Sequence, residues 1–318
     1  MRLAFLRLLL FLVATVWCGS LSHVVQADEF GGGANAFSIE FVTIGNPGNP
    51  ADRTGQPNPA GSVSYAYRIG KYEISEQMID KANALGSLGI THDNRGPDKP
   101  ASFISWFDAA IFINWLNEST GHTPAYKFDE YGDFQLWAPG DLGYDPANLF
   151  RNTQAKYFLP SNDEWYKAAY YDPIVDVYWD YPTGSNSPPT AVASGTAAGT
   201  AIYNQSTDAS PADVMQAGGL SPYGTMAQGG NVYERIETSF DSINDRTEGS
   251  PFVRGGAWAY GIETLTSSAL TSGSFDGRRP YIGFRVASVV PEPNAIVMVV
   301  TITLILLGSH RQRVSSET

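Results

Sequence analysis

Alternating apolar and polar positions along the middle of the chain predict a small number of strands. Residues 37–43, FSIEFVT, alternate in this way, which is typical of a strand with one buried face. Residues 63–74 predict a second strand, with a break at Gly70. Three shorter strands are expected later in the chain, at 233–238, 252–258 and 283–287.

The two clearest helices each begin with a capping box. Ser105 can accept a hydrogen bond from a first-turn amide, with Asp108 three residues later, and an apolar stripe follows at helical spacing. Ser161 and Glu164 repeat this arrangement before a second apolar stripe. The patterns predict two main helices at 105–118 and 161–171, with a further short helix at 76–85.

Residues 172–220 are rich in turn-forming side chains, and two interpretations compete. The segment is either a linker between domains or a long surface excursion within one domain. The excursion is favoured, because neither flank holds enough helices and strands to bury a core of its own. We therefore expect one α+β domain over residues 37–288, with two main helices, short twisted strands and many loops.

The N-terminus has the pattern of a secretory signal peptide over residues 1–27. Two arginines precede an apolar run that is too short to span a bilayer comfortably, and small residues Val25 and Ala27 precede a predicted cleavage before Asp28. A lipid anchor on Cys18 is the alternative, but Trp17 is bulky for the position before a lipidated cysteine. The sequence therefore predicts export.

The C-terminus carries a short apolar run at residues 295–307. As a helix it would be about 20 Å long, shorter than the roughly 30 Å hydrocarbon core of a bilayer. A permanent tail anchor is one interpretation. However, Pro291-Glu292-Pro293, the apolar run and the closing arginines together resemble the PEP-CTERM sorting signal, over residues 290–313. This resemblance implies removal of the tail by exosortase after transient membrane anchoring, which leaves a surface or extracellular-matrix protein.

Composition narrows the possible chemistry. The formal net charge of −12 argues against nucleic acid as a partner, because phosphate binding needs a basic surface. The only cysteine, Cys18, lies within the predicted signal peptide, so the mature chain has no thiolate nucleophile and no cysteine-ligated metal. His92 and His122 are too few for a three-histidine metal site.

Six segments, in order, resemble the formylglycine-generating enzyme family, also called sulfatase-modifying factors. They cover roughly residues 37–288 and read YRIGKYEIS, ISWFDAAIFINWLN, YFLPSNDEWYKAAYYDP, SPYGTMAQGGNVYE, FVRGGAWAY and YIGFRVAS. The resemblance implies a loop-rich domain related to C-type lectins.

The resemblance also implies an oxidation that this chain lacks the residues to perform. Family enzymes use two cysteines after the Arg-Gly-Gly motif to bind copper and convert a substrate cysteine to formylglycine. The matching positions here are Tyr260 and Leu265, and neither is a soft ligand for copper. We therefore expect no copper and no formylglycine generation.

A calcium site is the second implication of the resemblance. It would be formed by the carboxylates of Glu73 and Glu234 with the carbonyls of Gly230 and Val232, while a further family ligand position is occupied by Ala227. Oxygen ligands of this kind suit calcium. The alternative is that both glutamates pair with arginines such as Arg254.

Two functions remain open from the sequence. The first is an exported, non-catalytic binding module for an extracellular peptide or glycan. The second is an enzyme of unknown type that reuses the family cleft, expected around Tyr260, Leu265, Trp258 and Arg279. Converging ionisable groups in that cleft would favour the enzyme, whereas aromatic and hydrogen-bonding groups would favour the binding module. The sequence indicates neither the ligand nor the oligomeric state.

Overall fold

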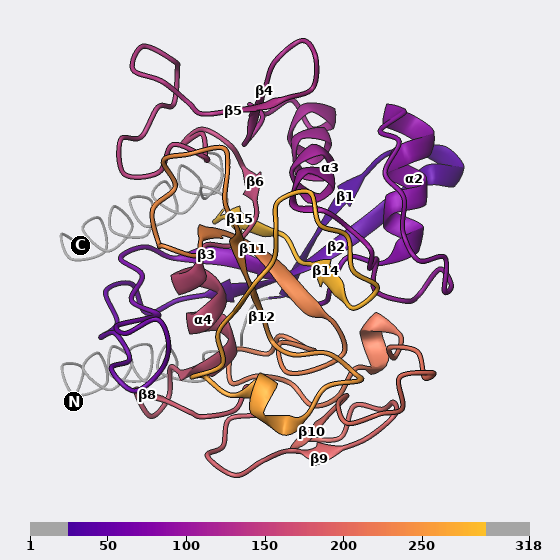
Figure 1. Ribbon diagram of the computed structural model, residues 1–318, viewed down its shortest axis with the longest axis vertical. Helices are drawn as coiled ribbons and strands as arrows, with labels where there is room; N and C mark the ends of the chain where they lie inside the picture. The colour runs from indigo at the N-terminus through magenta and orange to yellow at the C-terminus, as the bar shows by residue number, and fades with distance from the viewer. Residues whose placement is uncertain (1–24, 291–318) are drawn as a thin grey trace, which may run out of the picture. The chain divides into compact units, whose positions relative to one another are not determined.

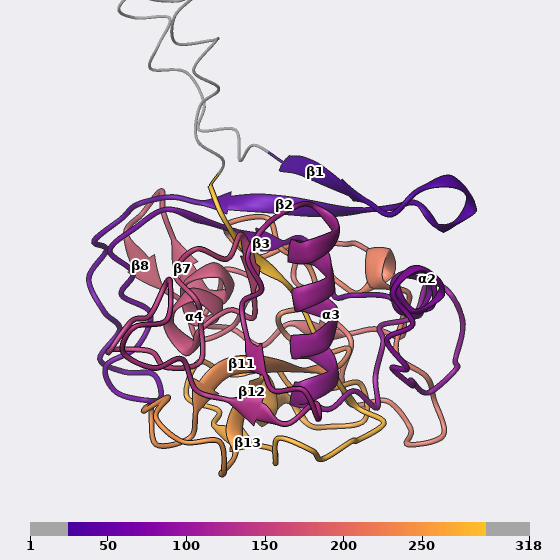
Figure 2. The same ribbon diagram turned by 90° about the horizontal axis from the view of Figure 1, so that it is seen from above.

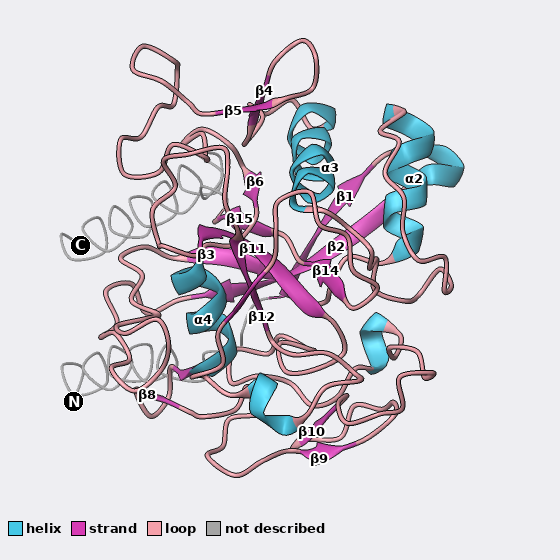
Figure 3. Ribbon diagram, viewed as in Figure 1, coloured by secondary structure: helices cyan, strands magenta, loops and turns pink. Residues whose placement is uncertain are grey.

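The structure is a computed structural model that describes residues 25–290. Most of the predicted signal peptide lies outside these residues, as do Pro291, Glu292 and Pro293. Two main sheets, three two-stranded pairs, three α-helices and long connecting loops make up the described domain (Figure 1 and Figure 3). None of the helices within 25–290 is long and apolar enough to cross a membrane.

The larger sheet joins the beginning of the described chain to its end. Its strand order is β1-β2-β3-β15-β6. The strands are β1 (Val25–Phe30), β2 (Phe37–Ile44), β3 (Tyr67–Gly70), β15 (Ala287–Val289) and β6 (Tyr157–Phe158). β2 pairs antiparallel with both β1 and β3. Its alternating burial confirms the strand predicted at 37–43.

The smaller sheet lies on the other side of the domain from β1 and β2 (Figure 2). Its order is β13-β12-β11-β14. The strands are β13 (Thr271–Ser272), β12 (Pro251–Arg254), β11 (Tyr233–Ser239) and β14 (Ile282–Phe284). β11 runs parallel to β14 and antiparallel to β12.

Three helices pack around the sheets, namely the two main ones expected and the further short helix expected at 76–85. They are α2 (Glu76–Gly86), α3 (Trp106–Ser119) and α4 (Asn162–Tyr170). Both predicted capping boxes form: Ser105 and Asp108 bond reciprocally at α3, and Ser161 and Glu164 do so at α4. α2 has a simpler cap from Ser75, yet at eleven residues it is longer than α4.

An aromatic cluster around Trp106 forms the centre of the main core. Its ring lies 5.0 Å from the rings of Tyr126 and Phe134 and 5.1 Å from that of Phe275. The indole Nε1 donates to the Ile236 carbonyl at 3.1 Å. Large rings compensate here for the small amount of regular structure, because each buries a large apolar area.

The excursion at 172–220 lies within the domain, as expected. Its short strand pairs are β7 (Tyr171–Asp172) with β8 (Val177–Tyr178), and β9 (Thr190–Ala191) with β10 (Thr200–Ala201). Buried Ile202 packs with Val232 of the core. A third pair, β4 (Lys127–Phe128) with β5 (Phe134–Gln135), and three 3-10 turns complete the described elements. The turns are η1 (Gly33–Asn35), η2 (Val214–Gln216) and η3 (Ile262–Leu265).

Three strand boundaries differ from the predictions. The strand expected at 63–74 is regular only over β3. The strand expected at 252–258 ends at Arg254, because Gly255 and Gly256 take φ angles of +96° and +77°. The strand expected at 283–287 divides into β14 and β15, which belong to different sheets, with Arg285 buried between them.

The predicted cleavage between Ala27 and Asp28 falls inside β1. Residues 25–27 are exposed, whereas the Asp28 carboxylate bonds Arg68 through both oxygens, at 2.9 and 2.7 Å, and accepts from the Tyr157 hydroxyl at 2.7 Å. Burial opposes ionisation of Asp28, but the Arg68 and Tyr157 contacts outweigh it and lower the pKa to about 2. Cleavage there would remove only the exposed part of the strand.

Candidate functional site

The two positions that correspond to the family cysteines lie in different environments. Tyr260 is half-buried and lines a cavity of about 370 Å³ on the smaller sheet. Leu265 is fully buried at the end of η3 and lines a separate cavity of only about 10 Å³. The structure therefore separates the two positions that the sequence places five residues apart.

We call the larger cavity the tyrosine cleft. It is formed mainly by side chains from all four strands of the smaller sheet and from the loops that follow them. Its lining consists of Tyr233, Arg235, Val253, Tyr260, Thr271, Ser272, Gly273, Ser274, Gly277, Arg279, Tyr281 and Ile282. None of these described lining residues is an aspartate, glutamate, histidine or cysteine.

Three tyrosines pack edge-to-face at the cleft. The ring centroids of Tyr260 lie 5.2 Å from Tyr233 and 5.1 Å from Tyr281, with interplanar angles of 79° and 64°. This geometry is favourable for aromatic pairs and holds the rings in fixed orientations. Burial raises the pKa of Tyr233 and of Tyr260, so both phenols are neutral at physiological pH.

The two arginines of the cleft have different surroundings. Arg235 is fully buried and donates to the carbonyls of Ile104 at 2.7 Å and Ser274 at 3.1 Å, with Gly277 as a third acceptor. Burial lowers its pKa to about 10. Arg279 is exposed, and no carboxylate or carbonyl within residues 25–290 hydrogen-bonds its guanidinium. Arg279 is therefore free to meet a ligand.

Only two of the four residues expected around the family cleft line it. Tyr260 and Arg279 do, whereas Leu265 does not and Trp258 is buried in the neighbouring core. The indole Nε1 of Trp258 has no partner among the described residues, and the Arg95 guanidinium lies 4.6 Å from its ring. Tyr233 and Tyr281 were not predicted as cleft residues, although both lie within the six motifs.

Both glutamates of the proposed calcium site are buried, and they lie close enough for the charge of Glu234 to act on Glu73. Glu73 is 1% exposed, and its Oε2 accepts from the Asn231 amide at 2.6 Å while Oε1 accepts from the Val232 amide at 3.3 Å. Burial and then the neighbouring charge of Glu234 raise the pKa of Glu73 well above its ordinary value. Gly230, at φ +96°, leaves no space for a side chain, since a Cβ there would lie 2.2 Å from the Ile202 carbonyl oxygen.

Glu234 is paired with Arg285 rather than with Arg254. Its Oε2 accepts from Arg285 Nε and from the Trp165 indole, both at 2.6 Å, and Oε1 accepts from Arg285 as well. Arg254 instead bonds Asn162 and two backbone carbonyls. Arg285 bonds Glu234, whereas Glu73 accepts only from the neutral Asn231 and Val232 amides. A charged Glu73 would therefore carry a negative charge that a proton or a hard cation can balance.

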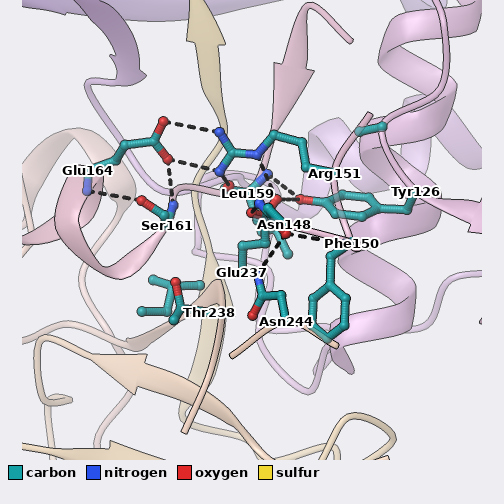
Figure 4. Close-up of polar contacts among 12 residues, drawn as sticks. Tyr126, Asn148, Phe150, Arg151, Leu159, Ser161, Glu164, Glu237, Thr238 and Asn244 are labelled. Atoms are coloured by element: carbon teal, nitrogen blue, oxygen red, sulfur yellow. Dashed lines mark hydrogen bonds and ion pairs between the residues drawn. The ribbon is translucent and has the colours of Figure 1, made fainter. Parts of the chain in front are cut away.

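A third polar cluster is centred on Arg151 (Figure 4). Arg151 bonds Glu164 at 2.9 Å and Glu237 at 2.8 Å, and both carboxylates are fully buried. The Tyr126 hydroxyl and the Asn148 amide complete the bonds to Glu237, at 2.9 and 2.6 Å. The cluster borders a polar groove of about 490 Å³. Nearly every oxygen in it accepts from the protein itself, so it serves as an internal connection between α4, β11 and the loop before β6.

The fold and the cleft together define a single, loop-rich α+β domain that carries an aromatic and basic cavity on its smaller sheet. The chain belongs to the family of the sulfatase-modifying factor enzyme 1-like domain, whose family model matches residues 42–290. The resemblance drawn from the six segments is thereby confirmed. No curated protein sequence matches the chain.

Solved structures share this fold at low sequence identity. Treponema denticola variable protein 1 superposes with a TM-score of 0.59 at 17% identity, over 84% of this chain and 99% of that one. PvdO from Pseudomonas aeruginosa has a TM-score of 0.54 at 17% identity, over 86% of this chain and 100% of its own. At this identity the likeness extends to the fold alone.

Proposed function

We propose that the protein is a non-catalytic binding module whose ligand site is the tyrosine cleft. One observation carries the proposal: the described lining residues comprise tyrosines, arginines, hydroxyls and apolar groups, without a carboxylate, imidazole or thiol. Imidazoles and carboxylates are the commonest general acids and bases, so their absence from the lining leaves only the phenols for such chemistry. The neutral tyrosines supply aromatic faces, and their hydroxyls supply hydrogen bonds.

The alternative is an enzyme that reuses the cleft with different chemistry. Its support is limited to Tyr260, since a deprotonated phenol is a base and a nucleophile. The raised pKa of Tyr260, caused first by burial, opposes that role near neutral pH. Formylglycine generation has no thiolate pair, because Tyr260 and Leu265 occupy the two positions.

The binding module is tested by screening the purified chain against an unbiased array of peptides and glycans. We expect a ligand that is retained by the wild type, released unaltered as judged by its mass, and lost by a Tyr260→Ala, Tyr281→Ala double variant. A ligand that leaves with a changed mass would support the enzyme instead. Binding that survives the double variant would place the ligand site outside the cleft. In a parallel assay, a cysteine-containing sulfatase peptide with copper should yield no formylglycine.

We also propose that the module is exported and sorted to the cell surface or matrix. The support is the signal-peptide pattern that ends at Ala27 and the Pro291-Glu292-Pro293 segment before the apolar run. Signal peptidase and exosortase would be the processing partners. Deleting residues 291–293 in the native host should leave a larger, membrane-retained form. Equal mass and equal fractionation of the two forms would favour a permanent tail anchor.

Calcium is proposed as a structural ion between Glu73 and Glu234, with the carbonyls of Gly230 and Val232. The support is the donor chemistry: two buried carboxylates, only one guanidinium, and oxygen as the ligand atom throughout. When bound, the ion would supply the positive charge that Glu73 lacks. The competing hypothesis is that a proton on Glu73 balances the site, and the two are separated by the melts described in the Discussion.

A further inference from the structure

The charge of the tyrosine cleft is opposite to that of the protein as a whole. The chain has a formal net charge of −12, yet the described cleft lining holds two arginines and no carboxylate. Two acidic residues lie near the cleft but are not among its lining residues: Asp276 accepts from the hydroxyl of the lining residue Ser274, and Glu263 belongs to η3. A negatively charged group on a ligand would therefore meet Arg279 without a competing carboxylate in the cleft.

Six of the lining side chains carry hydroxyls. These are the three tyrosines together with Thr271, Ser272 and Ser274. A hydroxyl both donates and accepts, so a surface rich in hydroxyls complements a ligand whose own groups do the same. Sugar hydroxyls have this property, whereas the carboxylates of an acidic peptide only accept. The half-buried ring of Tyr281, held by Tyr233 and Tyr260, adds an apolar face of fixed orientation.

The number of charges also limits the ligand. Arg235 is engaged with three backbone carbonyls, so Arg279 is the guanidinium available for a bidentate contact with a carboxylate. The acidic surface repels a ligand with many negative charges. This repulsion acts mainly between charges closer than about 8–10 Å, because salt screens more distant ones. A ligand that places one carboxylate in the cleft therefore matches the one available guanidinium, that of Arg279.

We propose that the tyrosine cleft binds an acidic saccharide, with its carboxylate on Arg279 and its sugar ring against the tyrosine faces. This inference rests on the proposed function, because it assigns a ligand class to the same cleft. It leads to a specific requirement: a saccharide with a carboxylate must bind better than the same saccharide without one, and Arg279 must cause the difference.

The probes are cellobiouronic acid, neutral cellobiose and a triglutamate peptide. Each is titrated by calorimetry into the full-length chain, purified in a detergent without a sugar headgroup. We expect cellobiouronic acid to bind at least about tenfold more tightly than cellobiose, equivalent to about 1.4 kcal/mol. Arg279→Gln should remove this preference, and Tyr281→Ala should weaken both saccharides. Arg278→Gln is the matched control, because Arg278 is also an exposed arginine but does not line the cleft.

Each outcome decides the inference. Equal binding of the two disaccharides, or a preference that survives Arg279→Gln, overturns the acidic-saccharide assignment. If cellobiose then still depends on Tyr281, the cleft remains a binding site and the proposed function stands. Binding of triglutamate in preference to both disaccharides identifies a peptide carboxylate and also overturns the inference. If none of the three probes binds, the inference is wrong, and the array screen alone decides the proposed function.

Discussion

The Arg151 cluster and the tyrosine cleft use arginine in opposite ways. Arg151 is held by Glu164 and Glu237, and its side chain is 13% exposed. The charges of these carboxylates outweigh the effect of burial and keep the pKa of Arg151 above its ordinary value. Arg279 has an open guanidinium and no partner among residues 25–290. In this acidic domain the paired Arg151 connects distant segments, whereas the unpaired Arg279 in the cavity is the observation that supports the proposed ligand site.

The largest effect is expected from Arg151→Met. Removal of Arg151 leaves two fully buried carboxylates without their cation, and breaking such a pair costs about 3–5 kcal/mol. At about 2–4 °C per kcal/mol, the melting temperature should fall by on the order of 10 °C. Thermal unfolding followed by circular dichroism measures the change. Arg246→Gln, which removes an exposed arginine with two surface carboxylate partners, should leave the melting temperature unchanged. Equal melting of the wild type and Arg151→Met would show that the cluster is dispensable.

The buried Glu73 should make the protein less stable as pH rises, whereas a carboxylate paired with an arginine makes it more stable. Its pKa is raised in the folded protein, so the folded state retains a proton that the unfolded chain loses above about 4.5. Without calcium, stability should therefore fall as pH rises from about 4.5 towards neutral. Glu73→Gln should reduce this slope and raise the melting temperature at pH 7 in chelator. If the wild type and Glu73→Gln show the same slope of stability against pH, the charge of Glu73 is already compensated and this prediction is wrong.

Calcium should replace the proton at that site. An ion at a hundredfold its Kd adds about 2.7 kcal/mol to stability, or several degrees of melting temperature. We expect the wild type to melt higher with calcium than with chelator, Glu234→Ala to show no shift, and Ala227→Asn to show a larger one. A wild-type melt that is indifferent to calcium would support the proton and leave both glutamates as structural carboxylates.

Asp28 represents an intermediate case, since its ion pair with Arg68 lies at the edge of the larger sheet. The lowered pKa means that its contribution is complete above the ordinary value of 3.8 and is lost as pH falls through about 2. Asp28→Asn should cost about 1–2 kcal/mol at pH 7, after allowing for partial solvent screening. Denaturant titration at pH 7 and pH 2 measures it. The two proteins should differ at pH 7 and converge at pH 2, and a constant difference would indicate a packing defect instead.

Local sequence signals predicted the helices well because their causes are local. Each capping box needs residues only three apart, and both boxes form as expected. The division between β14 and β15 was missed because it depends on Arg285 reaching Glu234, 51 residues earlier in the chain. The cleft was predicted only in part for the same reason. Counting along the chain located Tyr260 and Leu265, but it could not show that η3 directs Leu265 into the core while Tyr281 approaches from a later segment.

The smallest effects on stability are expected at two adjacent arginines, Arg278 and Arg279. Comparing their variants separates a contribution to stability from a contribution to ligand binding. Arg278 bonds both oxygens of Asp108, each at 2.8 Å, but its side chain is 41% exposed. Solvent screening limits the worth of that pair, so Arg278→Gln should cost no more than about 0.5–1 kcal/mol. Arg279→Gln breaks no hydrogen bond or ion pair within the described chain and should change the free energy of unfolding by less than about 0.5 kcal/mol. Denaturant unfolding of the two variants should therefore rank Arg278 above Arg279, whereas binding of cellobiouronic acid should rank them in the reverse order. If Arg279→Gln were the more destabilising change, the guanidinium would have a structural partner and the contrast with Arg151 would fail.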